Sequence, residues 1–178
     1  MTERVKAVLG VMRRVNHALL MLEKSVLVVL MVGMLIFGFL QVFSRYILKA
    51  PISWSAELLT YSFAWTSFVA AGMAVYTNSH FSVDLVVKHF PAKLYKVVML
   101  VIWALTLGLA VFLMYYGGRL AIANTIQRMN ILPLSMFWVY ITMPVCGFFM
   151  FFHGIEKTME VLYDIEPEHI PEEEIDLQ

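Results

Sequence analysis

Histidine, cysteine and carboxylate side chains carry most enzyme chemistry, and their placement here argues against a catalyst. Five histidines lie outside the middle of every long apolar stretch: His17, His80, His89, His153 and His169. A haem-binding membrane anchor needs axial histidines that project from mid-helix into a shared pocket. The single cysteine, Cys146, excludes disulfide and CxxC redox chemistry within the chain. Because no carboxylate pair, metal-ligand cluster or nucleophile–base arrangement is recognisable, we expect no enzymatic activity, no metal and no cofactor.

The overall composition indicates a membrane protein. Of 178 residues, 61% are hydrophobic and 15% are charged, whereas a soluble domain carries roughly 25% charged residues. The 13 Lys and Arg residues are balanced by 13 Asp and Glu residues. A surface that neutralises nucleic-acid phosphates is therefore not expected.

Four stretches free of Asp, Glu, Lys and Arg are each long enough to cross a bilayer, which takes roughly 20 helical residues. They are Ser25 to Ser44, Leu58 to Ser79, Val97 to Gly118 and Met129 to Phe152. The sequence predicts an all-α membrane protein with a four-helix transmembrane domain over residues 25–153. Segments on the side of the two termini hold nine Lys and Arg residues against four on the other side. Both termini are therefore expected in the cytoplasm.

Residues 1–24 form a separate element in this interpretation. Apolar residues such as Val8, Val15 and Leu22 recur at helical spacing, and the sequence predicts an amphipathic helix in the plane of the cytoplasmic headgroup layer. The chain would then turn into the first span, which is retained as a signal anchor. Residues expected at the lipid interface are Lys6, Arg13, Arg14, His17 and Lys24. This arm either anchors the protein in the plane or braces it against a partner protein.

The other end of the chain, residues 154–178, is acidic and interrupted by prolines, and we expect a partly disordered cytoplasmic tail. Small residues spaced four apart, which allow close helix packing in lipid, occur at Ser67 with Ala71 and at Ala104 with Gly108. Pro144 is expected to bend the fourth span. Glu57 is expected in the first turn of the second helix, where its carboxylate complements the helix dipole.

Taken together, these features resemble the small membrane subunit, the Q-type small permease, of tripartite ATP-independent periplasmic (TRAP) transporters. The resemblance extends over residues 25–153 and rests on an ordered series of short motifs. These are Arg45-Tyr46, Trp54, Glu57, Ala71-Gly72, His80, Asp84, Pro91, Pro133 and Pro144. With Ser67, these motif positions become candidates for contact with another subunit.

The resemblance implies a role without chemistry of its own, in the bacterial inner membrane. Such a subunit anchors a larger membrane subunit that binds sodium and substrate, while a soluble periplasmic protein delivers the substrate. The transported solute would be an organic acid: a C4-dicarboxylate, a sialic acid or a similar carboxylate. The scaffold role agrees with apolar spans whose interiors lack ionisable side chains.

Two alternatives remain open from the sequence. Four cations of the outer loops, Arg45, Lys49, Arg119 and Arg128, either dock the periplasmic binding protein or contact lipid headgroups. The chain could also be a self-contained, homo-oligomeric four-span channel or small transporter. Such a protein would need a polar stripe along one helix face, and no span has one longer than a few Ser and Thr residues.

Overall fold

The computed structural model describes residues 3–50, 52–77 and 92–163, and these residues form helices and connecting loops. The helices are α1 (Glu3–Tyr46), α2 (Ser53–Tyr76), α4 (Ala92–Phe112), α5 (Gly118–Ala123), α6 (Phe137–Tyr140) and α7 (Thr142–Leu162), with a π-helical segment over Leu113–Gly117. Within this part of the chain, four helical stretches are long and apolar enough to cross a membrane: Val8–Tyr46, Ser53–Tyr76, Leu94–Ala123 and Phe137–Leu162. The prediction of an all-α protein with four transmembrane helices is confirmed.

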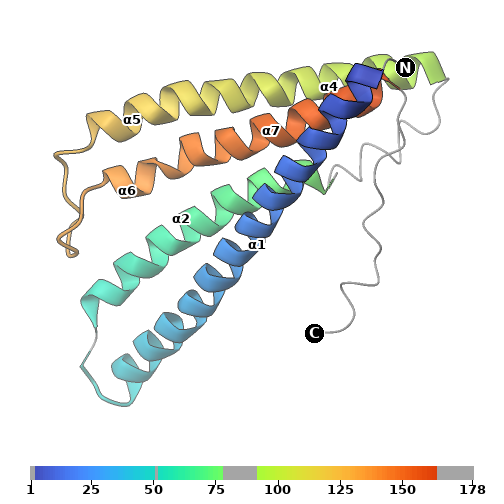
Figure 1. Cartoon of the computed structure of the whole chain (residues 1–178). Helices are drawn as coiled ribbons and strands as arrows, with labels where there is room; N and C mark the ends of the chain where they lie inside the picture. The colour runs from blue at the N-terminus through green and yellow to red at the C-terminus, as the bar shows by residue number, and fades with distance from the viewer. Residues whose placement is uncertain (1–2, 51, 78–91, 164–178) are drawn as a thin grey trace, which may run out of the picture.

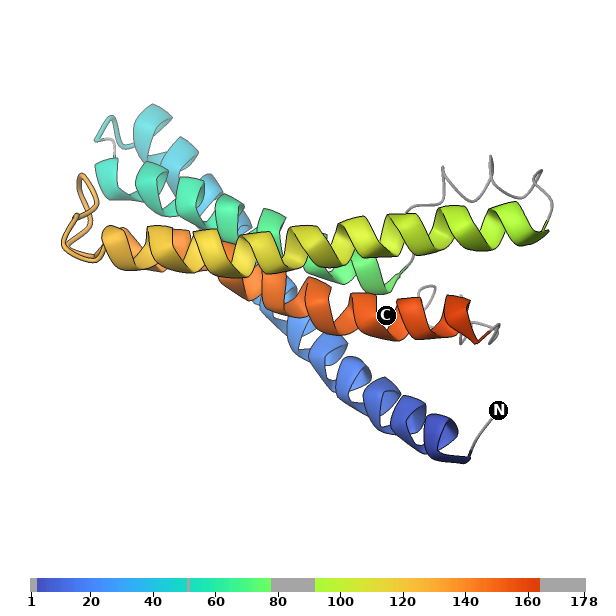
Figure 2. The same ribbon diagram turned by 90° about the horizontal axis from the view of Figure 1, so that it is seen from above.

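α7 lies between α2 and α4, and α1 crosses this layer at an angle (Figure 1). Seen from above, α1 crosses the other helices at an angle, and its N-terminal end lies away from them (Figure 2). One end of the molecule, here called the hairpin end, holds the α1–α2 connection and residues 124–136, which join α5 to α6. The opposite end, where α1 begins and α7 ends, is called the terminal end.

α1 is one uninterrupted helix of 44 residues, which corrects the predicted turn between an in-plane arm and the first span. The segment around the expected boundary, Leu22 to Val26, contains neither glycine nor proline, so nothing in it ends a helix. Glu23 is also buried against α7, which holds this part of α1 in place. The predicted arm and the first span are therefore two halves of the same helix.

The fourth span also differs from its predicted limits. Residues 127–136 form a loop instead of helix, so the span begins at Phe137 and not at Met129. It is interrupted at Ile141, one turn before Pro144, in agreement with the predicted bend. α7 then continues to Leu162, so the boundary predicted at residue 153 lies inside a helix.

Glycines bring α4 and α7 close together, but not the glycine predicted to do so. A Cβ at Gly147 would lie 2.7 Å from the carbonyl oxygen of Ala110, so the two backbones touch there. A Cβ at Gly117, which ends the π-helical segment, would lie 2.6 Å from the Cβ of Met143. Gly108, by contrast, has no neighbour within 4 Å of its Cβ position. The Ala104–Gly108 pair therefore does not form a helix interface within the described part of the chain.

Candidate functional site

A group of polar and charged side chains is buried between α1 and α7 at the terminal end. We call this group the buried polar cluster; its members are Arg13, Asn16 and Glu23 from α1 and His153, Glu156, Lys157 and Glu160 from α7. All except Arg13 are buried, and Arg13 is about one quarter exposed through its side chain. Burial of charged groups is costly unless they are paired, so each contact in this cluster matters for how α1 sits on α7.

The innermost contact joins Glu23 and His153, whose side chains have no solvent exposure. His153 Nε2 lies 3.1 Å from Glu23 Oε2, while the ring of Tyr76 from α2 packs edge-on against the imidazole at 5.1 Å. Gly72 makes room for this arrangement, because a Cβ there would lie 2.8 Å from Glu23 Oε1 and 3.0 Å from the Cβ of Phe149. Three helices, α1, α2 and α7, therefore meet at one carboxylate.

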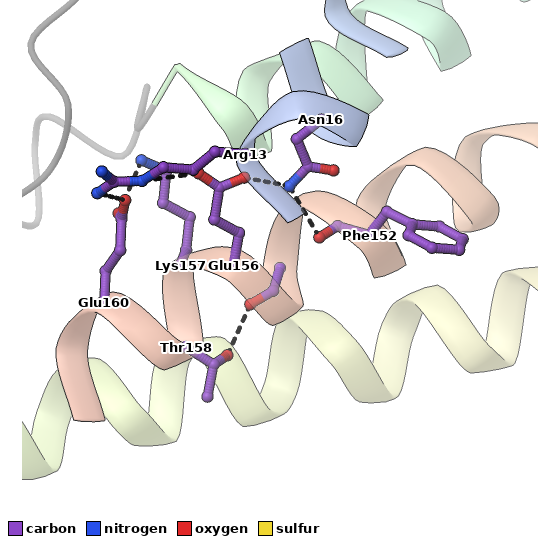
Figure 3. Close-up of polar contacts among 8 residues, drawn as sticks. Arg13, Asn16, Phe152, Glu156, Lys157, Thr158 and Glu160 are labelled. Carbon is purple, nitrogen blue, oxygen red and sulfur yellow. Dashed lines mark hydrogen bonds and ion pairs between the residues drawn. The ribbon is translucent and has the colours of Figure 1, made fainter. Parts of the chain in front are cut away.

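The remaining members of the cluster form a chain of contacts nearer the end of α7 (Figure 3). Asn16 donates to the backbone carbonyl of Phe152 at 3.1 Å and to the carboxylate of Glu156. Arg13 donates to Glu160 at 3.2 Å and lies 3.9 Å from Glu156. Lys157 donates to Glu160 at 3.0 Å. Two carboxylates and two permanent cations thus balance one another here.

This cluster was missed because the charges lie beyond the predicted limit of the fourth span and were assigned to a tail. Their spacing carried a signal: residues 153, 156, 157 and 160 share one face of a helix. In the described part of the N-terminal half of α1 the buried positions are Leu9, Asn16, Leu20 and Glu23, again at helical spacing. The predicted apolar stripe of the arm is not the packed face, since Val8, Val15 and Leu22 are exposed.

A second polar site lies at the hairpin end and is centred on Glu57 of α2. Its Oε1 accepts the backbone N–H of Asn130 at 2.8 Å, and its Oε2 accepts those of Ile131 and Leu132 at 2.9 and 2.8 Å. The hydroxyl of Tyr61 donates to Oε1 at 3.1 Å. Glu57 therefore holds the 124–136 loop onto α2. The prediction that it sits in the first turn is wrong, since that turn of α2 contains no acidic residue.

The 124–136 loop has its own hydrogen bonds as well. The N–H of Met129 donates to the carbonyl of Leu134 at 2.9 Å, and that of Met136 donates to Gln127 at 2.8 Å. The indole of Trp65 donates to the carbonyl of Trp138 at 2.9 Å, which connects α2 to α6. α2 thereby fixes both the loop and the start of the fourth span.

The other motif residues lie at separate places. Trp54 packs edge-on against Phe37 with ring centroids 6.0 Å apart, Ser67 and Ala71 are exposed on α2, and Pro133 is exposed in the loop. Gly72 is buried and Pro144 is half-buried beside Gly117. His80, Asp84 and Pro91 lie outside the described residues. The structure therefore joins Gly72 to the buried polar cluster and Glu57 to the loop.

The four outer-loop cations are all exposed at the hairpin end and fall on different segments. Arg45 and Lys49 flank the α1–α2 connection, where Lys49 adopts a positive φ of 52°. Arg119 lies over the ring of Tyr115 at 5.8 Å. Arg128 pairs with Ser135 in an isolated β-bridge.

The residues predicted at the lipid interface divide into two groups. Arg14, His17 and Lys24 are exposed on α1. Arg13 instead points toward α7 and binds Glu160. The side chain of Lys6 is not among those that the structure describes.

Chemically, both polar sites hold helices and loops together. Among residues 3–50, 52–77 and 92–163, no group of three or more His, Cys, Asp and Glu side chains is arranged to hold a metal ion. The arrangement favours a protein that is built to keep a fixed shape.

Comparison with known proteins agrees with this architecture. Residues 34–163 match the family described as "Tripartite ATP-independent periplasmic transporters, DctQ component". The sialic acid TRAP transporter small permease protein SiaQ of Vibrio cholerae is 28% identical over 144 residues, which cover 79% of this chain and 82% of that protein.

Two further relatives match over smaller shares of their length. The C4-dicarboxylate TRAP transporter small permease protein DctQ of Vibrio cholerae is 30% identical over 93 residues, or 52% of this chain and 40% of that protein. The sialic acid TRAP transporter permease protein SiaT of Haemophilus influenzae is 24% identical over 123 residues, or 68% of this chain and 20% of that protein. The chain therefore belongs to the DctQ component family and is a small permease subunit of a TRAP transporter.

Proposed function

We propose that this chain is the non-catalytic scaffold of a sodium-coupled transporter that imports an organic acid through the bacterial inner membrane. It lies beside a larger membrane subunit, which binds sodium and substrate, and it enlarges and anchors the static part of that subunit. The observation that carries this proposal is the apolar face of α1. Its large side chains, among them Val29, Leu35 and Phe39, are 69–73% exposed. They are therefore available for contact with lipid or with another membrane helix.

The internal organisation of the chain supports a static role. The polar contacts of Glu57 and of the buried polar cluster tie its own helices and loop together. Exposed Ser67 and Ala71 on α2 would allow close approach of a partner helix. Both termini lie in the cytoplasm in this proposal, so the hairpin end faces the periplasm.

The solute is a carboxylate such as a C4-dicarboxylate or a sialic acid, because these are the solutes that the names of the related transporters give. The solute reaches the complex on a soluble periplasmic binding protein, and its chemistry is read by that protein and by the large subunit.

Co-purification with the large membrane subunit of the same transporter tests the scaffold role. We expect a complex in mild detergent whose sodium-driven uptake in proteoliposomes collapses when the small subunit is left out. If the chain instead purifies as a homo-oligomer and conducts solute alone, the proposal is wrong and the chain is a channel or small transporter.

The exposed cations at the hairpin end contribute to docking of the binding protein in this proposal. Lys49→Glu with Arg128→Glu should weaken the apparent affinity of the binding protein at low salt, and added salt should reduce the difference. Unchanged affinity at low salt would assign these residues to lipid headgroups instead.

The exposed basic side chains Arg14, His17 and Lys24 contact anionic headgroups at the cytoplasmic surface in this proposal. Replacing Arg14 and Lys24 by Gln should reduce the amount of anionic lipid that co-purifies with the chain, as measured by native mass spectrometry. Arg13→Gln is the matched control, since Arg13 binds Glu160 and should affect stability instead of lipid retention.

A further inference from the structure

We propose that an exposed patch on the third membrane-spanning stretch binds the headgroup of a phospholipid, and that Arg119 contacts the lipid phosphate. The patch is called the aromatic–arginine patch here; its members are Phe112, Tyr115, Tyr116 and Arg119. The inference goes beyond the scaffold role. It holds for either orientation of the chain, because phospholipids form both surfaces of a membrane. Arg119 also lies on a different segment from Lys49 and Arg128, whose charge reversal tests docking of the binding protein.

The four side chains of the patch form one continuous surface. The ring centroids of Phe112 and Tyr116 are 4.6 Å apart. Those of Tyr115 and Tyr116 are 5.1 Å apart, with the two rings nearly perpendicular. The guanidinium of Arg119 lies over the ring of Tyr115, at 5.8 Å from its centroid. Positions 112, 115, 116 and 119 share one face at helical spacing, and the three aromatic residues are 54–58% exposed.

The patch faces away from the rest of the described chain. α7 lies between α2 and α4, so α4 and the segments that follow it form an edge of the layer (Figure 1). The side that packs on α7 is a different one and carries the buried residues Ala110 and Gly117. A Cβ at Gly117 would lie 2.6 Å from the Cβ of Met143. The patch is therefore open to lipid or to a partner protein.

The depth of each residue matches the layout of a phospholipid. The membrane-spanning stretch ends at Ala123. At about 1.5 Å per residue, Arg119 is roughly 6 Å from this end, Tyr115 and Tyr116 are roughly 10–12 Å from it, and Phe112 is roughly 16 Å from it. A phospholipid places its phosphate, its glycerol esters and its acyl chains in the same order. Tyrosine is also enriched where headgroups meet hydrocarbon.

Arg119 needs an anion that the described part of the chain does not supply. Residues 85–155 contain no Asp or Glu. Glu57, the acidic residue at the hairpin end, already accepts three backbone N–H groups of the 124–136 loop. A permanent cation at a membrane surface is stabilised by a paired anion, and the planar guanidinium binds a phosphate through two parallel hydrogen bonds.

The surface around Arg119 places this cation among lipid instead of in bulk water. Exposed apolar side chains continue beyond it toward the loop, where Ile122 is 70% exposed and Ile126 is 94% exposed. The hydroxyl groups of Tyr115 and Tyr116 make no hydrogen bond to another described residue, so they are available to the ester and phosphate oxygens of a lipid. One phospholipid satisfies the charge, the hydroxyl groups and the apolar rings together, whereas a protein partner would have to bring a carboxylate to the same depth.

Photo-crosslinking in the assembled complex identifies the occupant of the patch. Tyr116 is replaced by p-benzoylphenylalanine in the full-length chain, which is expressed with the large membrane subunit, extracted in mild detergent and irradiated. We expect the intact mass of the small subunit to rise by the mass of one phospholipid. The same replacement at Leu105, which is 70% exposed on α4 but distant from the patch, should give this adduct in the membrane and lose it after extraction. A crosslink from position 116 to the large subunit, or no adduct there after extraction, would overturn the proposal.

Lipid titration by native mass spectrometry tests the role of Arg119. Arg119→Gln should raise the apparent Kd of the complex for phosphatidylglycerol about five-fold, the change expected for one basic residue at a lipid surface. Arg128→Gln is the matched control, because it removes an exposed cation of the same end that pairs with Ser135 in the loop. It should leave the Kd unchanged. An unchanged Kd in Arg119→Gln, or an equal rise in both variants, would contradict a defined phosphate site.

Co-purification separates this proposal from the scaffold role. The large subunit should co-purify with Arg119→Gln as it does with the wild type, because the patch binds lipid. Loss of the large subunit in this variant would identify that subunit as the occupant and overturn the lipid site, while the scaffold role would stand.

Discussion

Replacement of Gly72 by alanine tests how closely α2 approaches Glu23. The added Cβ would lie 2.8 Å from Glu23 Oε1 and 3.0 Å from the Cβ of Phe149. Both distances are shorter than ordinary van der Waals contact, and overpacking of this kind costs about 1–3 kcal/mol. Alanine also gains about 1 kcal/mol of helix propensity over glycine, which would mask part of the cost if the variant were compared with the wild type alone.

Gly108→Ala is the matched control, because Gly108 is also within a helix and its Cβ position has no neighbour within 4 Å. The propensity gain is common to both variants, so the difference between them isolates the steric cost. We expect Gly72→Ala to be less stable than Gly108→Ala by about 1–3 kcal/mol. For a chain of this size that corresponds to a Tm lower by roughly 2–12 °C, measured by thermal unfolding in mild detergent.

A double substitution tests whether the loss of stability in Gly72→Ala comes from the contact with the carboxylate of Glu23. Shortening Glu23 to alanine removes the atom nearest to the new Cβ, so Gly72→Ala should destabilise the Glu23→Ala background less than the wild type. Equal stability of Gly72→Ala and Gly108→Ala would refute the close packing of Glu23 on α2. Strict additivity of the Gly72 and Glu23 substitutions would instead place the strain at Phe149.

Two further outcomes are expected from the hairpin end and from the α4–α7 contact. Glu57→Gln replaces one of two acceptor oxygens by a donor, so the amide protons of residues 130–132 should exchange faster in hydrogen-exchange mass spectrometry. Tyr61→Phe is the control, since it removes only the hydroxyl contact, and similar protection of the loop in both variants would contradict the assigned role. Gly147→Ala should lower the Tm more than Gly72→Ala, because its Cβ meets the rigid carbonyl of Ala110, at 2.7 Å, instead of a flexible side chain. A milder effect at Gly147 would mean that the two helices separate easily.

The sequence predicted the four membrane helices well, because runs without charge of that length have few other uses. The sequence did not predict where the helices begin and end, because single tertiary contacts determine these positions. The residues after Met129 are apolar enough for a span, yet Glu57 holds three of their backbone N–H groups in a loop. The sequence of residues 129–136 does not itself indicate that a carboxylate from another helix binds there.

The buried polar cluster shows a second kind of limit. When only the local composition is considered, the charged residues at positions 156–160 are interpreted as part of a solvated tail. The partners Arg13, Asn16 and Glu23 are more than 100 residues away along the chain and lie outside the segment that matches the family. Gly72 was predicted as a motif residue in contact with another subunit, whereas its close contact with the carboxylate of Glu23 became visible only in the three-dimensional structure.

The continuity of α1 has a mechanical consequence. A rod of 44 residues at about 1.5 Å per residue is roughly 66 Å long, and Glu23 lies close to its midpoint. The crossing at Glu23 can therefore act as a fulcrum. A tilt of about 10° around it would move either end of the rod by about 6 Å, in opposite directions. The two ends of α1 would therefore move together, because no break in the helix lies between them.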